Sequence, residues 1–300
     1  MRTSLDCLVC FMKQARSTGL LAGADLATQR CLCDEAGRFI AAADTNLSPP
    51  ENAIALYETF ARVLGSRDPF ARVKRESNEL ALSLRDAIRA QIAAADDPLR
   101  AAVQAAIGGN IIDYAAQHTF DAAQTMQDCF QREFAIDDYP ALQEAIRRVG
   151  RKILYLCDNC GEIVFDTLLI EQLQRVGCQV TAAVRGFPII NDATLEDARL
   201  CGLDRLCPVI SNGTACPGTP LAQCSEEFQT HFQAADLIIS KGMGNFETLS
   251  EVSAPIFFLF TVKCAQVAQH LRARQQVAPG TTITGSGEMV LLRQHTTSSS

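Results

Sequence analysis

The chain has 300 residues, of which 48% are apolar and 20% are charged, and its net charge is −7. This length suggests about two domains, and no apolar run approaches the roughly 18 residues of a membrane span. The acidic balance, with only five lysines, argues against nucleic-acid binding, which needs clustered cations. The first twenty residues carry Asp6 and Lys13 and lack the long apolar stretch of a secretory signal. We therefore expect a water-soluble, cytoplasmic protein that binds neither a membrane nor nucleic acid.

The thirteen cysteines are scattered from Cys7 to Cys264, which in a chain of this size favours reduced thiols over a disulfide framework. Two close pairs, Cys7 with Cys10 and Cys31 with Cys33, raise a thiolate metal site or a redox pair as alternatives. The second pair has one intervening residue instead of two. We favour buried free thiols on helix faces over a structural zinc ion at Cys7 and Cys10.

Residues 1–150 are predicted to form an all-helical domain. Apolar residues recur there at three- and four-residue spacing, and strand-like alternation is nearly absent. Prolines at positions 49, 50, 69 and 98 lie between the periodic segments, where a proline can begin a helix but cannot continue one. The periodic segments are residues 52–64, 75–95, 98–117 and 139–150.

The spacing of apolar residues changes in residues 151–293. The new pattern predicts a three-layer α/β/α domain of Rossmann-like type with a mostly parallel sheet. Short apolar runs alternate here with helical stretches, which is typical of βαβ units, and strands buried on both faces read as continuous apolar runs. The predicted strands are residues 152–157, 179–184, 236–240 and 255–260, and the helical stretches include residues 161–177 and 221–235. The tail, residues 294–300, has too few apolar groups to pack and is expected to be disordered.

Polar side chains follow each of the four predicted strands, and the carboxyl ends of parallel strands meet at one edge of a sheet. Asp158, Asn159 and Asp192 offer two carboxylates and a carboxamide oxygen, the hard ligands that magnesium or manganese prefers. Cations and backbone amides that would complement a phosphoryl group come from Arg185, Lys241, Gly242, Gly244 and Lys263. The pattern indicates metal-assisted phosphate chemistry.

Each of these residues has a structural alternative. Asp158 could serve only as the N-cap of the following helix, and Asn191 with Asp192 could cap residues 193–200. Asn245 could be a turn residue in a glycine-rich loop, and the lysines could be ordinary surface charges. The combination of residues is a stronger signal than any one of them.

Other nucleotide and hydrolase motifs are absent. The segment "DNCGEI" has one glycine where a dinucleotide fingerprint needs three, and neither a P-loop nor a G-x-S-x-G elbow is present. None of the four histidines is paired at metal-binding spacing, which argues against a zinc hydrolase centred on histidine.

Several long segments resemble the metal-dependent damage-control phosphatases, a family once described only as a domain of unknown function, and in particular its cysteine-containing prokaryotic branch. The similar segments, which span nearly the whole chain, are "DCLVCFMKQA", "AAIGGNIIDYA", "LCDNCGEIVFD", "RGFPIINDAT", "ADLIISKGMGNFETLS" and "FFLFTVKC". The resemblance implies that the helical half forms a cap over the edge of the sheet.

The resemblance also implies roles for individual residues. It places Asp158, Asn159 and Asp192 at metal-ligand positions. It places substrate contacts at Glu162, Lys241, Gly242, Gly244, Asn245, Glu247 and Lys263. Arg185 and Asn191 are further candidates from the strand ends, and Asn110 with Asp113 would face the cleft from one helix face. For this last pair, a helix-turn residue and a satisfied polar group between helices are the alternatives.

The implied activity is hydrolysis of a small phosphomonoester, such as a phosphosugar or a damaged phosphometabolite, by water activated on manganese, cobalt, nickel or magnesium. Glu162 could orient that water or bind a substrate hydroxyl, and covalent attack by Asp158 is the less simple route. Two rival functions stay open: a carboxylate methyltransferase, for which "DNCGE" is a poor cofactor loop, and a non-catalytic metabolite- or metal-binding protein.

Overall fold

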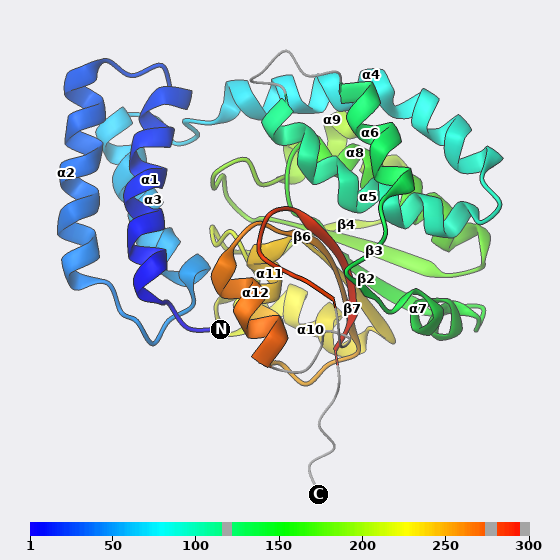
Figure 1. The fold of residues 1–300 in the computed structure, drawn as a ribbon. Coiled ribbons are helices and arrows are strands. Elements are labelled where there is room, and N and C mark those ends of the chain that lie inside the picture. Colours follow the sequence, from blue (N-terminus) through cyan, green and yellow to red (C-terminus); the bar gives the residue numbers. More distant parts are fainter. Residues whose placement is uncertain (116–121, 274–280, 295–300) are drawn as a thin grey trace, which may run out of the picture.

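The computed structural model describes residues 1–115, 122–273 and 281–294, and its first half is built of helices (Figure 1). Each predicted helix of this half is present, and the prolines at positions 49 and 98 open two of them, as their fixed φ favours. A two-residue strand also lies in this half. The elements are α1 (Leu5–Leu21), α2 (Leu26–Ala42), α3 (Pro49–Leu64), α4 (Ala71–Ala94), α5 (Pro98–Ala115), α6 (Ala122–Gln131), β1 (Ile136–Asp137) and α7 (Tyr139–Ile146).

The second half alternates strands with helices, as its sequence period predicts. Its elements are β2 (Lys152–Leu156), α8 (Glu162–Arg175), β3 (Gln179–Val184), α9 (Leu195–Cys201), β4 (Val209–Ser211), α10 (Glu226–Ala234), β5 (Leu237–Lys241), α11 (Met243–Leu249), β6 (Ile256–Val262), α12 (Ala265–Ala273) and β7 (Glu288–Arg293). The strands β1, β4 and β7 were not expected. The first two are too short to carry a period, and β7 does not follow the βαβ rhythm because it runs antiparallel to β6.

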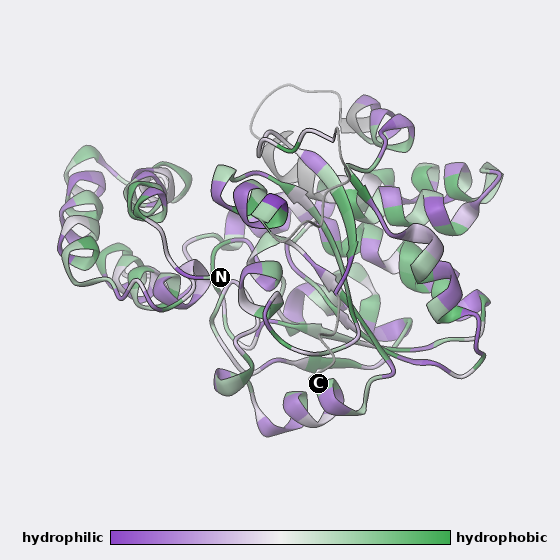
Figure 2. Cartoon of the chain, turned by 60° about the horizontal axis from the view of Figure 1, so that its bottom comes forward, coloured by the Kyte–Doolittle hydropathy of each residue, from purple (hydrophilic) through white to green (hydrophobic). Residues whose placement is uncertain are grey.

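The described strands form one seven-stranded sheet in the order β1-β7-β6-β5-β2-β3-β4, parallel except for the β6–β7 pair. This confirms the predicted mostly parallel α/β fold. Alternate residues of each strand enter two cores: Ile153 and Tyr155 of β2 pack with α4, α5 and α8, and Leu154 and Leu156 pack with α10 to α12 on the other face. In Figure 2 the strands at the centre are largely green, which marks hydrophobic residues.

The helical half divides by its packing. Helices α1 to α3 enclose a core of their own, whereas α4, α5 and α7 share a core with the sheet (Figure 1). Gly109 allows α5 to approach α8 closely, because a Cβ atom there would lie 2.8 Å from the ring of Phe165 and 3.2 Å from the Cα atom of Glu162. The second half of the helical region is therefore one layer of the α/β fold.

Gln294, which the sequence places in a disordered tail, is buried, and its N–H donates to the carbonyl oxygen of Ile256 at 2.8 Å. Residues 295–300 of that predicted tail lie outside the described residues. Within the described ranges, no helix combines the length and apolar character needed to cross a bilayer.

Candidate active site

The order of the strands reverses at the carboxyl end of β2, the position known as the crevice of an open α/β sheet. The chain runs from β2 to β3 and β4 on one side and then returns to β5 on the other side of β2. In open α/β sheets, ligands bind at such a switch point, where the connections leave in opposite directions. The polar segments after β2, β3 and β5 meet there.

The turn after β2 is held against the turn that follows β3. The carbonyl oxygen of Asp158 accepts the N–H of Ala193 at 2.8 Å, and Asn159 forms an isolated antiparallel bridge with Asp192. Gly161 closes the turn with a φ of 79°, a left-handed conformation that glycine adopts without strain. Residues 33 and 35 positions apart in the sequence are thus brought side by side.

Neither aspartate is an N-cap. Helix α8 begins after Gly161 and receives no side-chain cap, and α9 begins after Thr194, whose N–H donates to Asp197 at 2.9 Å. Asp158 and Asp192 are buried at 7% and 3% exposure and point to a shared guanidinium instead. The capping alternative therefore fails for both.

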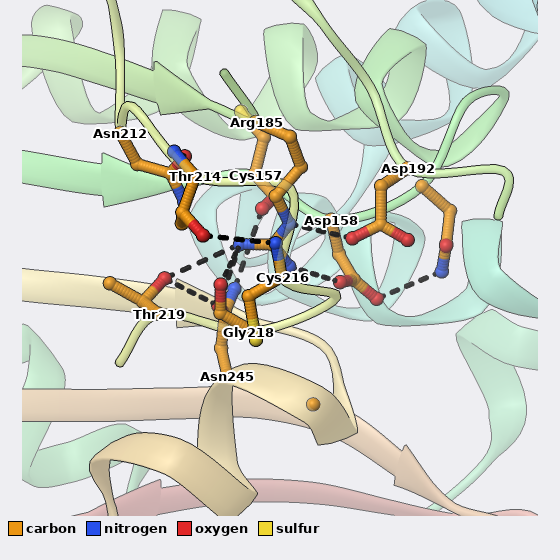
Figure 3. A network of polar contacts seen from close by, with 12 residues as sticks. Cys157, Asp158, Arg185, Asp192, Asn212, Thr214, Cys216, Gly218, Thr219 and Asn245 are labelled. Carbon is orange, nitrogen blue, oxygen red and sulfur yellow. Dashed lines mark hydrogen bonds and ion pairs between the residues drawn. The ribbon is translucent and has the colours of Figure 1, made fainter. Parts of the chain in front are cut away.

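That guanidinium belongs to Arg185, which follows β3 (Figure 3). Its Nε donates to Asp192 at 2.6 Å and its Nη2 donates to Asp158 at 3.0 Å. Its Nη1 donates to the carbonyl oxygen of Gly218 at 3.0 Å and to Oδ1 of Asn245 at 2.9 Å. Arg185 is 2% exposed, so it binds the two carboxylates from the protein interior. It does not lie at the open edge of the sheet, where the sequence predicted a cation that would contact a phosphoryl group.

The pair of carboxylates carries more negative charge than its surroundings neutralise. Burial and the neighbouring Asp192 raise the pKa of Asp158, and burial raises the pKa of Asp192, while Arg185 opposes both shifts. One guanidinium cannot balance two buried carboxylates. A cation at this position would relieve the repulsion between them.

Lys241, the last residue of β5, lies in a separate buried cluster. Its Nζ donates to Asp166 at 2.8 Å, to the carbonyl oxygen of Ala106 at 2.7 Å, and to Glu162. Lys241, Glu162 and Asp166 are each fully buried, and Tyr155 donates to Asp166 at 2.6 Å. All three ammonium protons are taken, so Lys241 does not reach the edge of the sheet as the sequence suggested.

This cluster positions Glu162 beside the crevice. Burial alone would lower the pKa of Lys241, but Asp166 and Glu162 raise it, and burial raises the pKa of Asp166 to about 6. Nδ2 of Asn159 lies 3.4 Å from Oε2 of Glu162. Glu162 thus connects the buried lysine to the turn that holds Asp158 and Asn159.

The glycines after β5 allow close approach of the backbone. A Cβ atom on Gly242, whose φ is 80°, would collide with the Asp158 carboxylate, and one on Gly244 would collide with the carbonyl oxygen of Pro217. Asn245 is buried in α11 and donates from Nδ2 to the carbonyl oxygen of Lys241 at 2.7 Å. These residues support the site through backbone geometry.

The other predicted site residues lie at different depths. Lys263 is exposed just after β6, and Asn191 is partly buried, with its carbonyl oxygen accepting the N–H of Cys160 at 2.8 Å. Glu247 is partly buried on α11, and burial raises its pKa to about 7. Asn110 and Asp113 belong to α5, but their side chains fall outside the described part of the structure.

The cysteines are free thiols throughout the described chain. Cys7 is buried in the core of α1 to α3, whereas Cys10 and Cys31 are exposed and Cys33 is partly exposed. Burial raises the pKa of Cys157, which directly follows β2 next to the site. A buried thiol with a raised pKa is a poor nucleophile and a poor metal ligand.

The donor set at the crevice suits a hard divalent cation. Asp158, Asn159 and Asp192 present oxygens from two adjoining turns, and the second carboxylate oxygen of Asp192 accepts no hydrogen bond from any described residue. Among the described residues, no three His, Cys, Asp or Glu side chains form a cluster that could hold a metal ion. Two carboxylates with one amide oxygen would leave several positions for water, as magnesium-type sites commonly do.

Sequence reasoning missed several residues of the network in Figure 3. Thr219 donates to Oδ1 of Asn245 at 2.7 Å, and Oδ1 of Asn212 accepts the N–H groups of Gly186 and Thr214, both at 3.1 Å. Asn212 directly follows β4, so recognising that short strand would have added it to the strand-end residues. The segment around Thr219 has no periodicity that could have indicated its place.

The fold and this site define an α/β protein with a buried pair of carboxylates at the switch point of its sheet. The chain belongs to the family of the damage-control phosphatase ARMT1-like domain, whose model matches residues 3–277. A damage-control phosphatase from Pyrococcus horikoshii is 36% identical over 276 residues, covering 91% of this chain and 95% of that protein. One from Archaeoglobus fulgidus is 37% identical over 225 residues, covering 73% and 77%. The crystal structure of a DUF89 family protein from P. horikoshii superposes with a TM-score of 0.87 at 34% identity, covering 98% of this chain and all of the other.

Proposed function

We propose that this protein is a divalent-metal-dependent phosphatase that hydrolyses small phosphomonoesters, such as phosphosugars or damaged phosphometabolites. The observation that carries the proposal is the pair of buried carboxylates, Asp158 and Asp192, which share one guanidinium at the switch point of the sheet. Membership of the damage-control phosphatase family supports the same reaction class.

The residues at the crevice would have different roles in this reaction. Asp158, Asn159 and Asp192 would hold manganese, cobalt, nickel or magnesium, which when bound would polarise a phosphoryl oxygen and lower the pKa of an attacking water. Arg185 holds the carboxylates of Asp158 and Asp192 in fixed positions through hydrogen bonds of 3.0 and 2.6 Å. Lys263, exposed after β6, would contact the phosphoryl oxygens.

Attack by water is favoured over attack by Asp158. Both carboxylate oxygens of Asp158 are already engaged, Oδ1 by Arg185 at 3.0 Å and Oδ2 by Asn159 at 2.8 Å. A carboxylate fixed in this way is suited to orient a ligand. Glu162, held by Lys241 and 3.4 Å from Nδ2 of Asn159, would orient the water or a substrate hydroxyl through Asn159.

The test is phosphate release from a panel of phosphosugars with and without added manganese, cobalt, nickel or magnesium. We expect turnover only with metal. Asp158→Asn and Asp192→Asn should each lower kcat/KM by more than about 100-fold, because even loss of an outer-shell partner typically costs 10–100-fold. Asp204→Asn, at an exposed position beyond α9, serves as the matched control and should retain activity.

Absence of turnover with every metal, together with unchanged metal binding by the two aspartate variants, would contradict the proposal. Transfer of a methyl group to a carboxylate without phosphate release would support the methyltransferase alternative. Tight binding of phosphosugar and metal without turnover would support a non-catalytic binding protein.

A further inference from the structure

A buried asparagine on helix α4 contacts the turn that carries Asp158 and Asn159. The N–H of Gly161 donates to Oδ1 of Asn78 at 2.7 Å, across 83 residues of sequence. Asn78 is fully buried. It belongs to the helical half, and no sequence motif singled it out.

The side chain of Asn78 is fixed in orientation by its second partner. Its Nδ2 donates to Oδ1 of Asp197 at 3.2 Å, while Oδ2 of Asp197 accepts from Nζ of Lys74 at 2.9 Å and from the N–H of Thr194 at 2.9 Å. Although burial alone would raise the pKa of Asp197, Lys74 lowers it, so the carboxylate stays ionised and can only accept. The carbonyl end of Asn78 must therefore face Gly161.

The contact supplies the acceptor for the N–H of Gly161, at the point where the turn after β2 meets α8. Gly161 immediately precedes α8 and has no side chain that could cap the helix. Its φ of 79° is accessible chiefly to glycine. A buried N–H without an acceptor would cost about 1–3 kcal/mol. Asn78 supplies that acceptor to Gly161, which is two residues after Asn159 and three after Asp158.

The same network reaches the second turn. Thr194, which donates to Asp197, is two residues after Asp192, and Thr194 also forms a parallel bridge with Arg185. Asn78 and Asp197 together therefore tie α4 to both turns that carry the oxygen donors. A side chain that served only to fill the interface between α4 and α8 would not need this connection.

We propose that Asn78 is a positioning residue for the metal-binding turn, holding Asp158 and Asn159 at the geometry that a divalent cation requires. The inference rests on the proposed function, because it assumes that these two residues bind metal. It predicts that removing Asn78 weakens metal binding beyond what loss of stability explains.

The experiment measures manganese binding by isothermal titration calorimetry, together with urea unfolding of the metal-free protein. Asn78→Ala should weaken manganese binding by about 10–100-fold, the range typical of outer-shell partners. Asn52→Ala is the matched control: Asn52 is a buried asparagine of α3 whose Nδ2 donates to Thr3 at 2.9 Å and to the carbonyl oxygen of Asp44 at 2.8 Å. It should lose stability and keep its manganese affinity.

A rescue pair separates positioning from packing. In the double variant Asn78→Asp with Asp197→Asn, the new carboxylate accepts from Gly161 and from the new amide, whose oxygen still accepts from Lys74 and Thr194. This variant should recover most of the manganese affinity. Asn78→Asp alone sets two carboxylates against each other and should bind manganese more weakly than the double variant. This comparison decides the question if Asn78→Ala does not fold.

Wild-type manganese affinity in Asn78→Ala, with a loss of stability like that of Asn52→Ala, would overturn the inference and leave the proposed function intact. Equal manganese affinities of Asn78→Asp and the double variant would do the same. If the wild-type protein binds none of the four metals, both the proposed function and this inference fail.

Discussion

At the scale of single residues, burial decides which charged groups face the crevice. Arg185 and Lys241 both follow predicted strands, yet both are almost completely buried and donate hydrogen bonds to other residues of the protein. Lys263 follows a strand in the same way and is exposed. The three cations looked equivalent in the sequence because the position after a strand does not specify the depth of its side chain.

Glu247 provides a prediction about pH at this scale. Burial raises its pKa from 4.5 to about 7, so between these values the folded protein keeps a proton that the unfolded chain has released. Stability must then fall as pH rises from about 4.5 to 7 and level off above. We expect Glu247→Gln, which mimics the protonated form, to gain on the order of 1–3 kcal/mol relative to the wild type across this window.

Urea unfolding of both proteins at several pH values between 4.5 and 8 measures the difference. Glu226→Gln, at an exposed position in the first turn of α10, is the control for removing a glutamate charge. A difference between wild type and Glu247→Gln that stays constant with pH would show that Glu247 ionises as it does in the unfolded chain.

At the scale of elements, one buried ion cluster links three of them. Lys241 ends β5, Glu162 and Asp166 belong to the first turns of α8, and Ala106 belongs to α5. The lysine therefore joins the sheet to two helices of the same layer through bonds of 2.7 and 2.8 Å and its contact with Glu162. One Oδ of Asp166 is buried without a described partner, which makes the cluster sensitive to loss of its cation.

Lys241→Met should lower the free energy of unfolding by about 3–5 kcal/mol, because it leaves two buried carboxylates without their cation. Chemical denaturation at neutral pH measures this loss. Lys152→Met is the matched control, since Lys152 is exposed at the start of β2, and it should change stability by less than about 0.5 kcal/mol. Equal effects of the two substitutions would mean that the cluster does not support the layer.

The helix-forming segments were predictable at this scale, and the short strands were not. A helix such as α4 shows its 3.6-residue period over many turns, whereas β4 has three residues and β1 has two. The strand β1 joins the sheet only because β7 lies beside it, and that pairing brings together residues 136 and 290. A contact of this range leaves no local trace in the sequence.

At the scale of the whole molecule, the described residues form three hydrophobic cores. Two lie on the faces of the sheet, and the third lies within α1 to α3. Ile189, from the loop that leads to Asp192, packs into this third core, and its neighbour Ile190 has a φ of 46°, which is uncommon for a β-branched residue. The helical bundle thus contacts one of the loops that build the site.

The separate core predicts separate local stability. Leu56 is fully buried in the third core, and Leu56→Ala should cost about 2–5 kcal/mol by leaving a cavity. Hydrogen exchange should quicken for amides of α1 to α3 while amides of β5 and β6 stay protected.

Leu259→Ala, at a fully buried position of β6 in a sheet core, is the contrasting substitution. It should quicken exchange across the sheet. If Leu56→Ala quickened exchange equally in the bundle and in the sheet, the bundle would not be a unit of its own.

The fold class and the proximity of Asp158 to Asp192 follow from local sequence patterns. Hydrophobic period distinguishes helix from buried strand, and parallel strands bring their carboxyl ends to one edge, so Asp158 and Asp192 could be placed together before any coordinates. The folded chain, in contrast, was needed to see that Arg185 lies between them, that Lys241 is buried with Glu162, and that Asn78 bonds to Gly161. The bonds of Arg185 with Asp158, of Lys241 with Glu162 and of Gly161 with Asn78 join residues 27, 79 and 83 positions apart. They depend on how helices pack over the sheet, which no local pattern encodes.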